Sequence, residues 1–592
     1  MSDPNFTRVP AHPVGPTPGI DRVVPAIPCR AEKCETRLHI SVFFDGTGNN
    51  RYEHEPLLKQ SNVARLFRAY PDDPMGGYFR MYVPGIGTRF PEIGEDEPAT
   101  FGAAFGEGGD GRINFGLLHV INSIHRAVSP SGRRYAMDHT VRALCRNGTR
   151  KRIHTRSGTN LTQLADVTDA AALRHVGMET KGGLLLSNTG TSLHRLAFFK
   201  KATREIAQKV RDAEKPKLVE IFIDVFGFSR GAAQARTFCN WLSEIFDDSH
   251  LCGVPATIRF LGLFDSVASV GIPTSSNVGT DGHASWADAS LLRVPAGVKN
   301  CVHYVAMHEN RGSFPVELVR VAGVLPANCH EYMFPGMHSD VGGGYSPNEQ
   351  GRGPNARDDE KLSLLPLETM YGAATAALVP LNKRLARDGD YDPFTVADSM
   401  RAAFTAFMSA RQQSRRIRDW LSEYLVWRYQ VRHSYMTLAW ADRANGEGGD
   451  DESLEDLRGA NRCLLDDVAA FEGLAELREQ GGFHHPRSAV AQARGRHAAR
   501  IRSLEREARE VYELVRAAGA ASSEASTLFA DYCHDSYAGF RPFDKVKVYG
   551  WDPVPGSWEP QGYLRWRRRY EGDDLQLTRH GPALQEDSLQ HA

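Results

Sequence analysis

The strongest constraint on the fold is a buried strand that leads into a helix through a short, serine-containing turn. The stretch "KLVEIFIDVFGF" (217–228) is apolar and rich in β-branched and aromatic residues, which is typical of a buried strand. The Ala-rich stretch 230–246 has helical spacing. The pentapeptide "GFSRG" (227–231) joins the two and fits the pattern G-x-S-x-G. A nucleophile elbow requires this strand–turn–helix context, so the pattern predicts a catalytic serine at a strand end.

The residue types around Ser229 suit that role. A nucleophilic serine sits on a sharp, strained turn that holds its hydroxyl above the sheet. Gly227 and Gly231 leave room for the helix to pack back against the strand. The amide of Arg230 lies at the helix start, where the helix dipole helps it donate to an oxyanion. We therefore expect Ser229 to attack and Arg230 to supply one donor of the oxyanion hole.

A serine nucleophile needs a base and an acid that orients the base. In hydrolases with such an elbow, the chain order is Ser, then Asp or Glu, then His. The stretch "TIRFLGLFDSVAS" (257–269) predicts a strand that ends at Asp265. The sites of open α/β sheets form at the carboxyl ends of strands. We predict that Asp265 is the acid, and the alternative is a carboxylate that only caps the next loop.

The predicted base is His338, in "MFPGMHSDVGGGY" (333–345). Three glycines follow closely and allow a turn that presents the imidazole. His303 and His308 are rivals, but they lie in an apolar, strand-like run and are more typical of core residues. His534, in "YCHDSYAGF", is the other rival and is also a candidate for supporting the site or contacting substrate. Asp340 is expected to brace the loop that carries His338.

The stretch "VFFDGTGNN" (42–50) resembles the D-x-D-G-T signature of phosphatases with an aspartate nucleophile. Phe43 occupies the position of that nucleophile, and a phenyl ring can neither attack phosphorus nor hold magnesium. The loop instead predicts a second oxyanion donor beside the elbow, from the amide of Gly46 or Thr47. Asp45 is expected to fix this loop by accepting its amides, and contact with substrate is the alternative.

Composition excludes several classes of function. The 592 residues carry a formal net charge of -1, which argues against nucleic acid as the main partner. No run of about 18 apolar residues predicts a transmembrane helix, and the first residues lack a signal-peptide pattern. Cys29 and Cys34 lie close together, but a zinc site would need two further ligands, so no metal site is predicted. The scattered cysteines are typical of reduced thiols in a protein made in the cytoplasm.

The pattern along the chain predicts four parts. Residues 1–35 form a Pro-rich lead. Strands alternate with helices over 36–345, with inserted loops at about 90–185, which predicts an α/β fold with a mostly parallel sheet covered on both faces. Residues 346–530 are largely helical, and 531–592 are expected to pack back on the core.

Two basic regions carry alternatives that the sequence leaves open. The stretch "RNGTRKRIHTRSGTN" (146–160) is interpreted as an exposed insertion, with a phosphate-binding patch as the alternative. The helices of 346–530 have Arg-rich faces with interspersed Trp and Tyr. Such faces are most often solvated, and the alternative is contact with an anionic membrane surface.

Several motifs taken together resemble a known family. They are "FFDGTGNN", "YVPGIGT", "GFSRGAAQAR", "LFDSVAS" and "FPGMHSDVGGGY", in this order. The set resembles the bacterial type VI secretion lipase effectors, and most closely their first class, the phospholipase A type with a GFSRG-like elbow. The carboxy-terminal "HDSYAGF" and "GYLRWRRRYEGD" are also similar to the closing segment of that family.

The resemblance implies an α/β-hydrolase core with the triad Ser229, Asp265 and His338, and no cofactor. It implies release of fatty acid from membrane glycerophospholipids, with help from the helical region at the membrane. It also implies that the type VI apparatus injects the protein into rival bacteria, where it acts in the periplasm or at the membrane surface. A separate spike-tip protein would carry it, and a cognate immunity protein would protect the producer.

Two other functions remain open from the residues alone. One is a serine esterase of the same fold that acts on soluble acyl esters, because fold and triad do not determine the acyl substrate. The other is a non-enzymatic binding protein whose helical half does the work. The presence of Ser, Asp and His in the required order argues against the second.

Overall fold

A computed structural model describes most of the chain, with gaps. The described residues are 5–11, 19–24, 35–98, 108–145, 152–154, 160–162, 189–213, 216–268, 285–312, 314–444, 451–472, 498–539 and 562–571. Cys29 and Cys34 lie outside them, as does most of the basic stretch 146–160.

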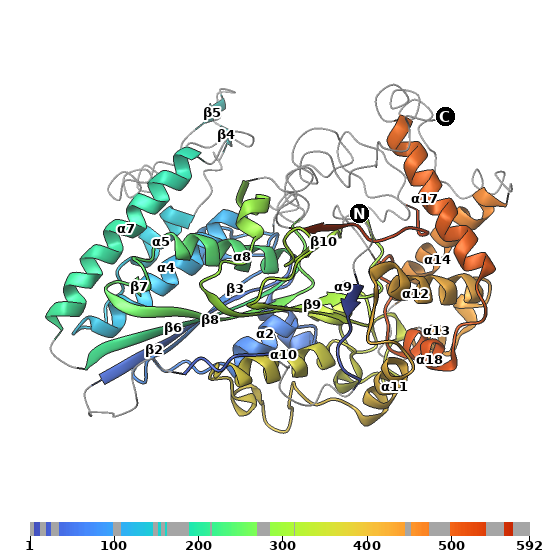
Figure 1. The fold of residues 1–592 in the computed structure, drawn as a ribbon, viewed down its shortest axis with the longest axis horizontal. Coiled ribbons are helices and arrows are strands. Elements are labelled where there is room, and N and C mark those ends of the chain that lie inside the picture. The colour runs from blue at the N-terminus through green and yellow to red at the C-terminus, as the bar shows by residue number, and fades with distance from the viewer. Residues whose placement is uncertain are drawn as a thin grey trace.

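A seven-stranded sheet organises the part of the chain from residue 35 to residue 334 (Figure 1). Its main path runs in the order β11 (Cys329–Phe334), β9 (Val298–Ala306), β8 (Val254–Phe264), β6 (Lys217–Phe228), β2 (Glu35–Phe44) and β3 (Tyr78–Val83). All neighbours on this path are parallel, and β7 (His250–Leu251) adds an antiparallel edge on β8. Parallel strands bring all their carboxyl ends to one edge, so the loops after β2, β6, β8 and β11 meet there.

Helices cover both faces of the sheet, as the alternating pattern predicts (Figure 1). One face carries α4 (Gly109–Val128), α5 (Asp138–Cys145), α7 (Thr189–Asp212) and α8 (Arg230–Ser243), and the other carries α2 (Asn62–Ala69) and α10 (Leu364–Ala376). Side chains alternate along each strand between two hydrophobic cores. On β2, Val42 and Phe44 enter the core beneath α4 and α8, whereas Phe43 enters the core beneath α2.

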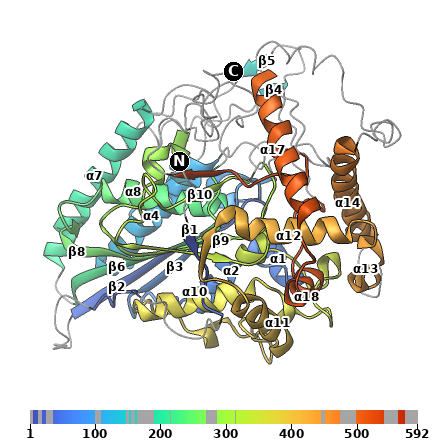
Figure 2. The same ribbon diagram turned by 45° about the vertical axis from the view of Figure 1, so that its right-hand side comes forward.

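The helices of the carboxy-terminal half gather beside one end of the sheet (Figure 2). They are α11 (Asp398–Ser409), α12 (Ile417–Val431), α13 (Ala439–Ala444), α14 (Asp451–Phe471), α17 (Ala498–Ala517) and α18 (Ser523–Asp531). Between α11 and α12 the chain forms the short strand β12 (Ser414–Arg416). These helices share a hydrophobic core with the α2 face of the sheet, so the two halves pack together.

Short elements complete the described part. They are α1 (Arg51–His54), α9 (His338–Gly342), β1 (Asn5–Thr7), β4 (Arg152–His154), β5 (Asn160–Thr162), β10 (Val316–Leu318), β13 (Arg569–Glu571) and the 3-10 helices η1 (Glu55–Leu57), η2 (Pro91–Ile93), η4 (Ser285–Ala287), η5 (Ala289–Leu292), η6 (Glu349–Gly351), η7 (Asp358–Glu360), η8 (Lys383–Ala386) and η9 (Tyr435–Thr437). Two small sheets join distant parts of the chain, because β1 pairs with β12 and β10 pairs with β13. The Pro-rich lead therefore contributes to the folded body, with Phe6 fully buried.

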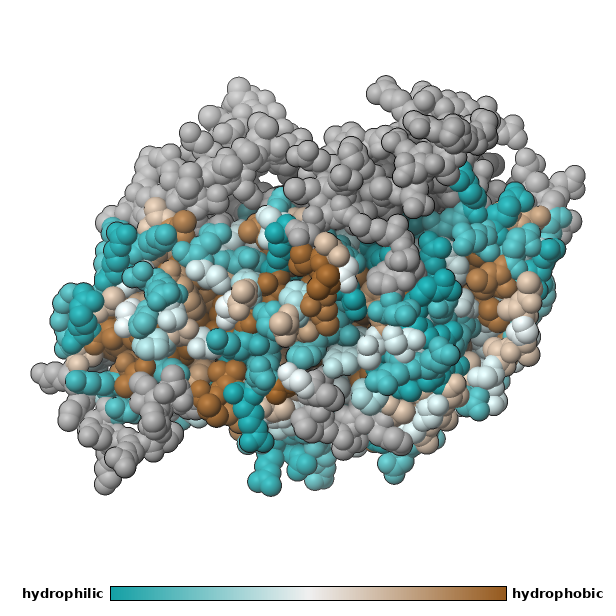
Figure 3. All heavy atoms as spheres, in the orientation of Figure 1, coloured by the Kyte–Doolittle hydropathy of each residue, from teal (hydrophilic) through white to brown (hydrophobic). Residues whose placement is uncertain are grey.

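No helix of the described residues is long and apolar enough to cross a membrane. The face in Figure 3 is mostly hydrophilic, with smaller hydrophobic patches between. Large exposed hydrophobic side chains are spread over several elements, for example Met75, Met137 and Leu514. Scattered exposed hydrophobic residues are ordinary for a folded protein.

Candidate active site

Ser229 lies on the turn between β6 and α8 and has strained backbone angles. Its φ is 57° and its ψ is -127°, a combination that costs free energy for a residue other than glycine. The turn is held in place because the Ser229 amide donates to the carbonyl of Phe264, at 3.0 Å. The Ser229 carbonyl accepts from the amide of Val267, at 3.2 Å. Both bonds tie the turn to the residues that flank Asp265.

Gly227 and Gly231 allow the close packing that this turn needs. A Cβ atom at residue 231 would lie 2.3 Å from the carbonyl oxygen of Asp45. A Cβ atom at residue 227 would lie 2.6 Å from the Cα of Ala232. Both distances are far below a normal contact, so a side chain at either position would push α8 away from the sheet.

Asp265 follows β8 directly, with its carboxylate fully buried and a φ of 38°. Its Oδ2 atom lies 2.6 Å from His338 Nδ1. Its Oδ1 atom accepts the amide of Ala306, at 2.9 Å. The two carboxylate oxygens also accept a forked pair of hydrogen bonds from Arg567, at 2.8 and 2.7 Å. Burial alone would raise the pKa of Asp265, but the Arg567 charge and the His338 hydrogen bond hold it well below its usual range.

His338 is the first residue of α9 and is buried at the carboxyl edge of the sheet. Its ring packs against Phe228, with ring centroids 4.7 Å apart, and against Phe314 at 5.0 Å. Burial lowers the pKa of His338, while the Asp265 carboxylate opposes that shift. The imidazole is therefore neutral near pH 7, as a general base must be, and its Nδ1–H bond to Asp265 leaves Nε2 as the basic atom.

The loop after β2 packs directly on the serine turn. A Cβ atom at Gly46 would lie 2.5 Å from the Phe228 ring, so this loop contacts the residue just before Ser229. Asp45 accepts the Gly46 amide at 2.8 Å and the Tyr82 hydroxyl at 2.5 Å. In this structure the Gly46 amide is thus turned toward Asp45, and donation to an oxyanion would require that bond to break. The Arg230 side chain bonds Thr47 Oγ1 through Nε, at 2.6 Å.

His534 forms a second histidine–aspartate pair next to the first. Its Nδ1 atom lies 2.6 Å from Asp340 Oδ1, and its amide donates to Asp340 Oδ2 at 3.1 Å. Asp340 also accepts the amide of Met337, at 2.9 Å, and so braces the start of α9. The His534 ring stacks on Tyr345, with centroids 3.7 Å apart.

The other two histidine rivals are core residues. His303 uses both ring nitrogens, since Nδ1 meets Glu331 at 3.1 Å and Nε2 accepts the amide of Ser266 at 3.1 Å. His308 accepts the amide of Gly336 at 2.9 Å and packs its ring against Phe529. Neither ring is paired with Asp265.

Three residues near the predicted triad were not predicted from the sequence. Arg567 bonds Asp265, Glu309 accepts the amide of His338 at 3.3 Å, and Phe314 covers the His338 ring. The Arg311 charge, opposing the effect of burial, lowers the pKa of Glu309 to about 2, so Glu309 is a carboxylate. The basic run "RWRRRYEG" was a visible signal for Arg567, but nothing in it distinguishes one arginine from the next.

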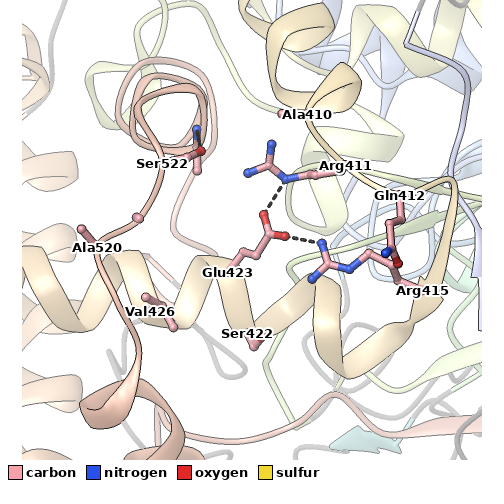
Figure 4. A pocket seen from close by; sticks show the side chains of 11 residues that line it. Ala410, Arg411, Gln412, Arg415, Ser422, Glu423, Val426, Ala520 and Ser522 are labelled. Atoms are coloured by element: carbon pink, nitrogen blue, oxygen red, sulfur yellow. Dashed lines mark hydrogen bonds and ion pairs between the residues drawn. The ribbon is translucent and has the colours of Figure 1, made fainter.

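A separate pocket of about 530 Å³ lies between α12, the end of α11 and the start of α18 (Figure 4). Within it, Arg411 and Arg415 both bond the carboxylate of Glu423. No residue of the predicted active site is part of its lining. Among the described residues, no group of three or more His, Cys, Asp and Glu side chains is arranged to hold a metal ion.

Comparison with known proteins points to one family for part of the chain. Residues 244–373 match the family model described as the catalytic domain of Tle1-like type VI secretion phospholipase effectors. This range includes Asp265 and His338 and begins just after α8 ends. No curated protein matches the chain at a significant level.

Two solved structures are similar to this chain to different degrees. One is an uncharacterized protein from Pseudomonas aeruginosa, 23% identical, with a TM-score of 0.64 over 91% of this chain and 80% of that chain. The other is the Tle1 effector bound to the VgrG spike of the type 6 secretion system, 20% identical, with a TM-score of 0.25 over 53% of this chain and 52% of that chain. The first likeness shows a shared fold, and the second superposes too poorly to bear on the fold.

Proposed function

We propose that the chain is an antibacterial type VI secretion effector that hydrolyses acyl ester bonds of membrane glycerophospholipids. The observation that carries the proposal is the strained Ser229 turn, bonded to the residues on either side of Asp265, with Asp265 2.6 Å from His338. Strain at a serine between a strand and a helix is the signature of a nucleophile elbow. The family match over 244–373 supports a phospholipase effector of the type VI system.

The proposed reaction is acyl transfer through an acyl-enzyme. His338 Nε2 takes the proton of the Ser229 hydroxyl while the serine oxygen attacks the ester carbonyl. Backbone amides hold the tetrahedral oxyanion. The candidates are those of Arg230 and Thr47, because the Gly46 amide donates to Asp45. His338 then protonates the leaving lysophospholipid oxygen. Water repeats the sequence on the acyl-enzyme and releases the fatty acid.

The proposal extends to the other parts of the chain and its partners, as the resemblance of the motifs implies. A separate spike-tip protein carries the effector, which is made in the cytoplasm and delivered to the periplasm or membrane surface of the target cell. An immunity protein protects the producer. The helical region 346–530 approaches the membrane, and the reaction needs no cofactor. The division of the chain at residues 35, 345 and 530 belongs to this proposal too.

Product analysis on phospholipid vesicles tests the proposal. The wild type is expected to release fatty acid and lysophospholipid, and Ser229→Ala is expected to lose roughly 10⁴-fold or more in kcat. Phospholipids with two distinguishable acyl chains would identify the ester position that is cut. A Ser229→Ala protein that still releases fatty acid would overturn the proposal.

The same experiment separates the two alternatives. Cleavage of short soluble esters without cleavage of vesicles would favour the soluble esterase. A folded wild type that neither cleaves esters nor reacts with a fluorophosphonate at Ser229 would favour the binding protein.

A further inference from the structure

Arg567 holds the carboxylate of Asp265 from a remote part of the chain. Its Nη1 atom donates to Asp265 Oδ1 at 2.8 Å, and its Nη2 atom donates to Oδ2 at 2.7 Å. The Arg567 side chain is 2% exposed and the Asp265 side chain is 0% exposed. A forked guanidinium–carboxylate pair fixes the plane of the carboxylate as well as its charge.

Arg567 donates to the same carboxylate oxygen of Asp265 that lies next to His338. Asp265 Oδ2 accepts from both Arg567 and His338, while Oδ1 accepts from Arg567 and from the amide of Ala306. Four donors thus determine the orientation of one buried carboxylate. Without Arg567, each oxygen would keep one donor, and the carboxylate would be held less firmly opposite the imidazole.

Arg567 also bonds Phe314, whose ring packs against His338. Its Nε atom donates to the carbonyl of Phe314 at 2.9 Å, and the Phe314 ring covers the His338 ring. The segment that carries Arg567 is anchored on both sides. Upstream, Asn310 donates to the carbonyl of Tyr563 at 2.9 Å, and downstream β13 pairs with β10.

We propose that Arg567 is a positioning residue of the Ser229 site, which orients Asp265 toward His338 and sets the pH above which His338 acts as a base. This inference rests on the proposed function, because it assumes that His338 and Asp265 serve Ser229. It adds Arg567, far along the chain from Ser229, to the residues that orient Asp265.

The expected pH effect follows from charge. The Arg567 guanidinium offsets part of the Asp265 charge, which otherwise stabilises the protonated form of His338. Removing the guanidinium therefore favours protonated His338 and moves the acidic limb of kcat/KM to higher pH. The other charged and titratable groups near His338 stay the same in every variant; they are Glu309, Arg311, Asp340, Tyr345 and His534.

The test uses the full chain with a soluble ester, p-nitrophenyl butyrate, and a fluorophosphonate probe. Arg567→Gln is expected to lower kcat/KM by about 100-fold, as for a displaced catalytic group, and to shift the acidic limb upward by about one pH unit. Arg567→Lys keeps the charge but cannot form the forked pair of hydrogen bonds. It should therefore lower kcat and leave the acidic limb of the pH profile where it is in the wild type. Arg384→Gln removes an exposed charge from η8 and should behave like the wild type.

The outcomes decide between positioning and a merely structural role. Thermal unfolding identifies variants that do not fold, and Arg567→Lys keeps the test valid if Arg567→Gln is one of them. A folded Arg567→Gln or Arg567→Lys protein with the kcat/KM and pH profile of the wild type would overturn the inference. Equal losses of kcat/KM in Arg567→Gln and Arg567→Lys, with no shift of the acidic limb in either, would also overturn it.

The result is independent of the phospholipid substrate. If Ser229 cleaves the soluble ester but the protein does not cleave vesicles, the proposed function fails and the Arg567 result stands. If vesicles are cleaved through Ser229 and the Arg567 variants match the wild type, only the inference about Arg567 fails. A wild type in which Ser229 reacts with neither ester nor probe would overturn both.

Discussion

Two histidine–aspartate pairs meet on the five-residue helix α9 and differ in ways that matter for chemistry. In both, the Nδ1 atom lies 2.6 Å from a carboxylate oxygen, with His338 on Asp265 and His534 on Asp340. Asp265 also accepts hydrogen bonds from the Arg567 guanidinium, whereas Asp340 accepts hydrogen bonds from two backbone amides. The short distance alone therefore does not identify the catalytic base.

What distinguishes the pairs is their surroundings. His338 packs on Phe228, the residue just before the strained Ser229, so the ring lies beside the Ser229 turn. His534 stacks flat on Tyr345, and its Nε2 atom is buried without a hydrogen-bond partner in the described part of the chain. We infer that the first pair moves protons and that the second holds α9 in place.

Replacing each histidine by asparagine should give the largest contrast. Asparagine keeps a donor near the position of Nδ1 and removes Nε2. His338→Asn should lose roughly 10⁴-fold in kcat because it has no base. His534→Asn should stay within about tenfold of the wild type, because its Nε2 atom makes no hydrogen bond that would be lost.

Initial rates on p-nitrophenyl butyrate, normalised to the folded fraction, would measure this contrast. A His534→Asn protein as inactive as His338→Asn would break the comparison. The two pairs would then act together in catalysis.

A smaller contrast is expected for the two aspartates. Asp265→Asn should lose about 10³- to 10⁴-fold in kcat, because an amide cannot stabilise protonated His338 as a carboxylate does. It also leaves the buried Arg567 charge unpaired, which should lower the free energy of unfolding by about 3–5 kcal/mol. Asp340→Asn breaks no guanidinium pair and changes only hydrogen bonds, so its cost should be about 1–3 kcal/mol, with kcat within about tenfold.

Chemical denaturation would measure the free energy of unfolding of each variant, and steady-state kinetics on the same preparations would measure its kcat. Equal activity losses in the two variants would argue that Asp340 acts on His338 as strongly as Asp265 does.

The sequence predicts the sheet better than the contacts between its loops. The predicted strand 217–228 coincides with β6, because a long apolar run is a local signal. The prediction of a mostly parallel sheet with helices is confirmed. Pairings between distant segments carry no local signal. The Pro-rich lead gives no hint that Phe6 is buried and that β1 pairs with β12.

Candidate site residues were predicted by type and order, and their partners only in part. A serine elbow, an aspartate after a strand and a histidine before glycines follow from local chemistry. The proximity of Asp265 and His338 depends on where β8 and β11 lie in the sheet. The choice of Arg567 among four arginines within 565–569 depends on how that segment crosses the sheet edge, which no spacing rule provides.

The smallest expected effect concerns Asp45, a buried carboxylate that forms no ion pair with the described residues. Burial raises the pKa of Asp45 to about 6, although hydrogen bonds from Ser61, Tyr82 and Gly46 oppose the shift. Asp265, with its guanidinium, shifts in the opposite direction. The folded protein thus keeps the Asp45 proton to a higher pH than the unfolded chain does. The free energy of unfolding should fall as the pH rises from about 4 to 6, by up to about 3 kcal/mol from this group.

Asp45→Asn removes that titration, so urea unfolding at several pH values should show a wild-type-minus-variant difference that declines between about pH 4 and 6 and is level above. Asp390→Asn, which removes an exposed carboxylate, is the matched control and should give a nearly constant difference. A constant difference for Asp45→Asn as well would mean that Asp45 ionises in the fold as easily as in the unfolded chain. In that case, burial without a cation would not be what separates Asp45 from Asp265.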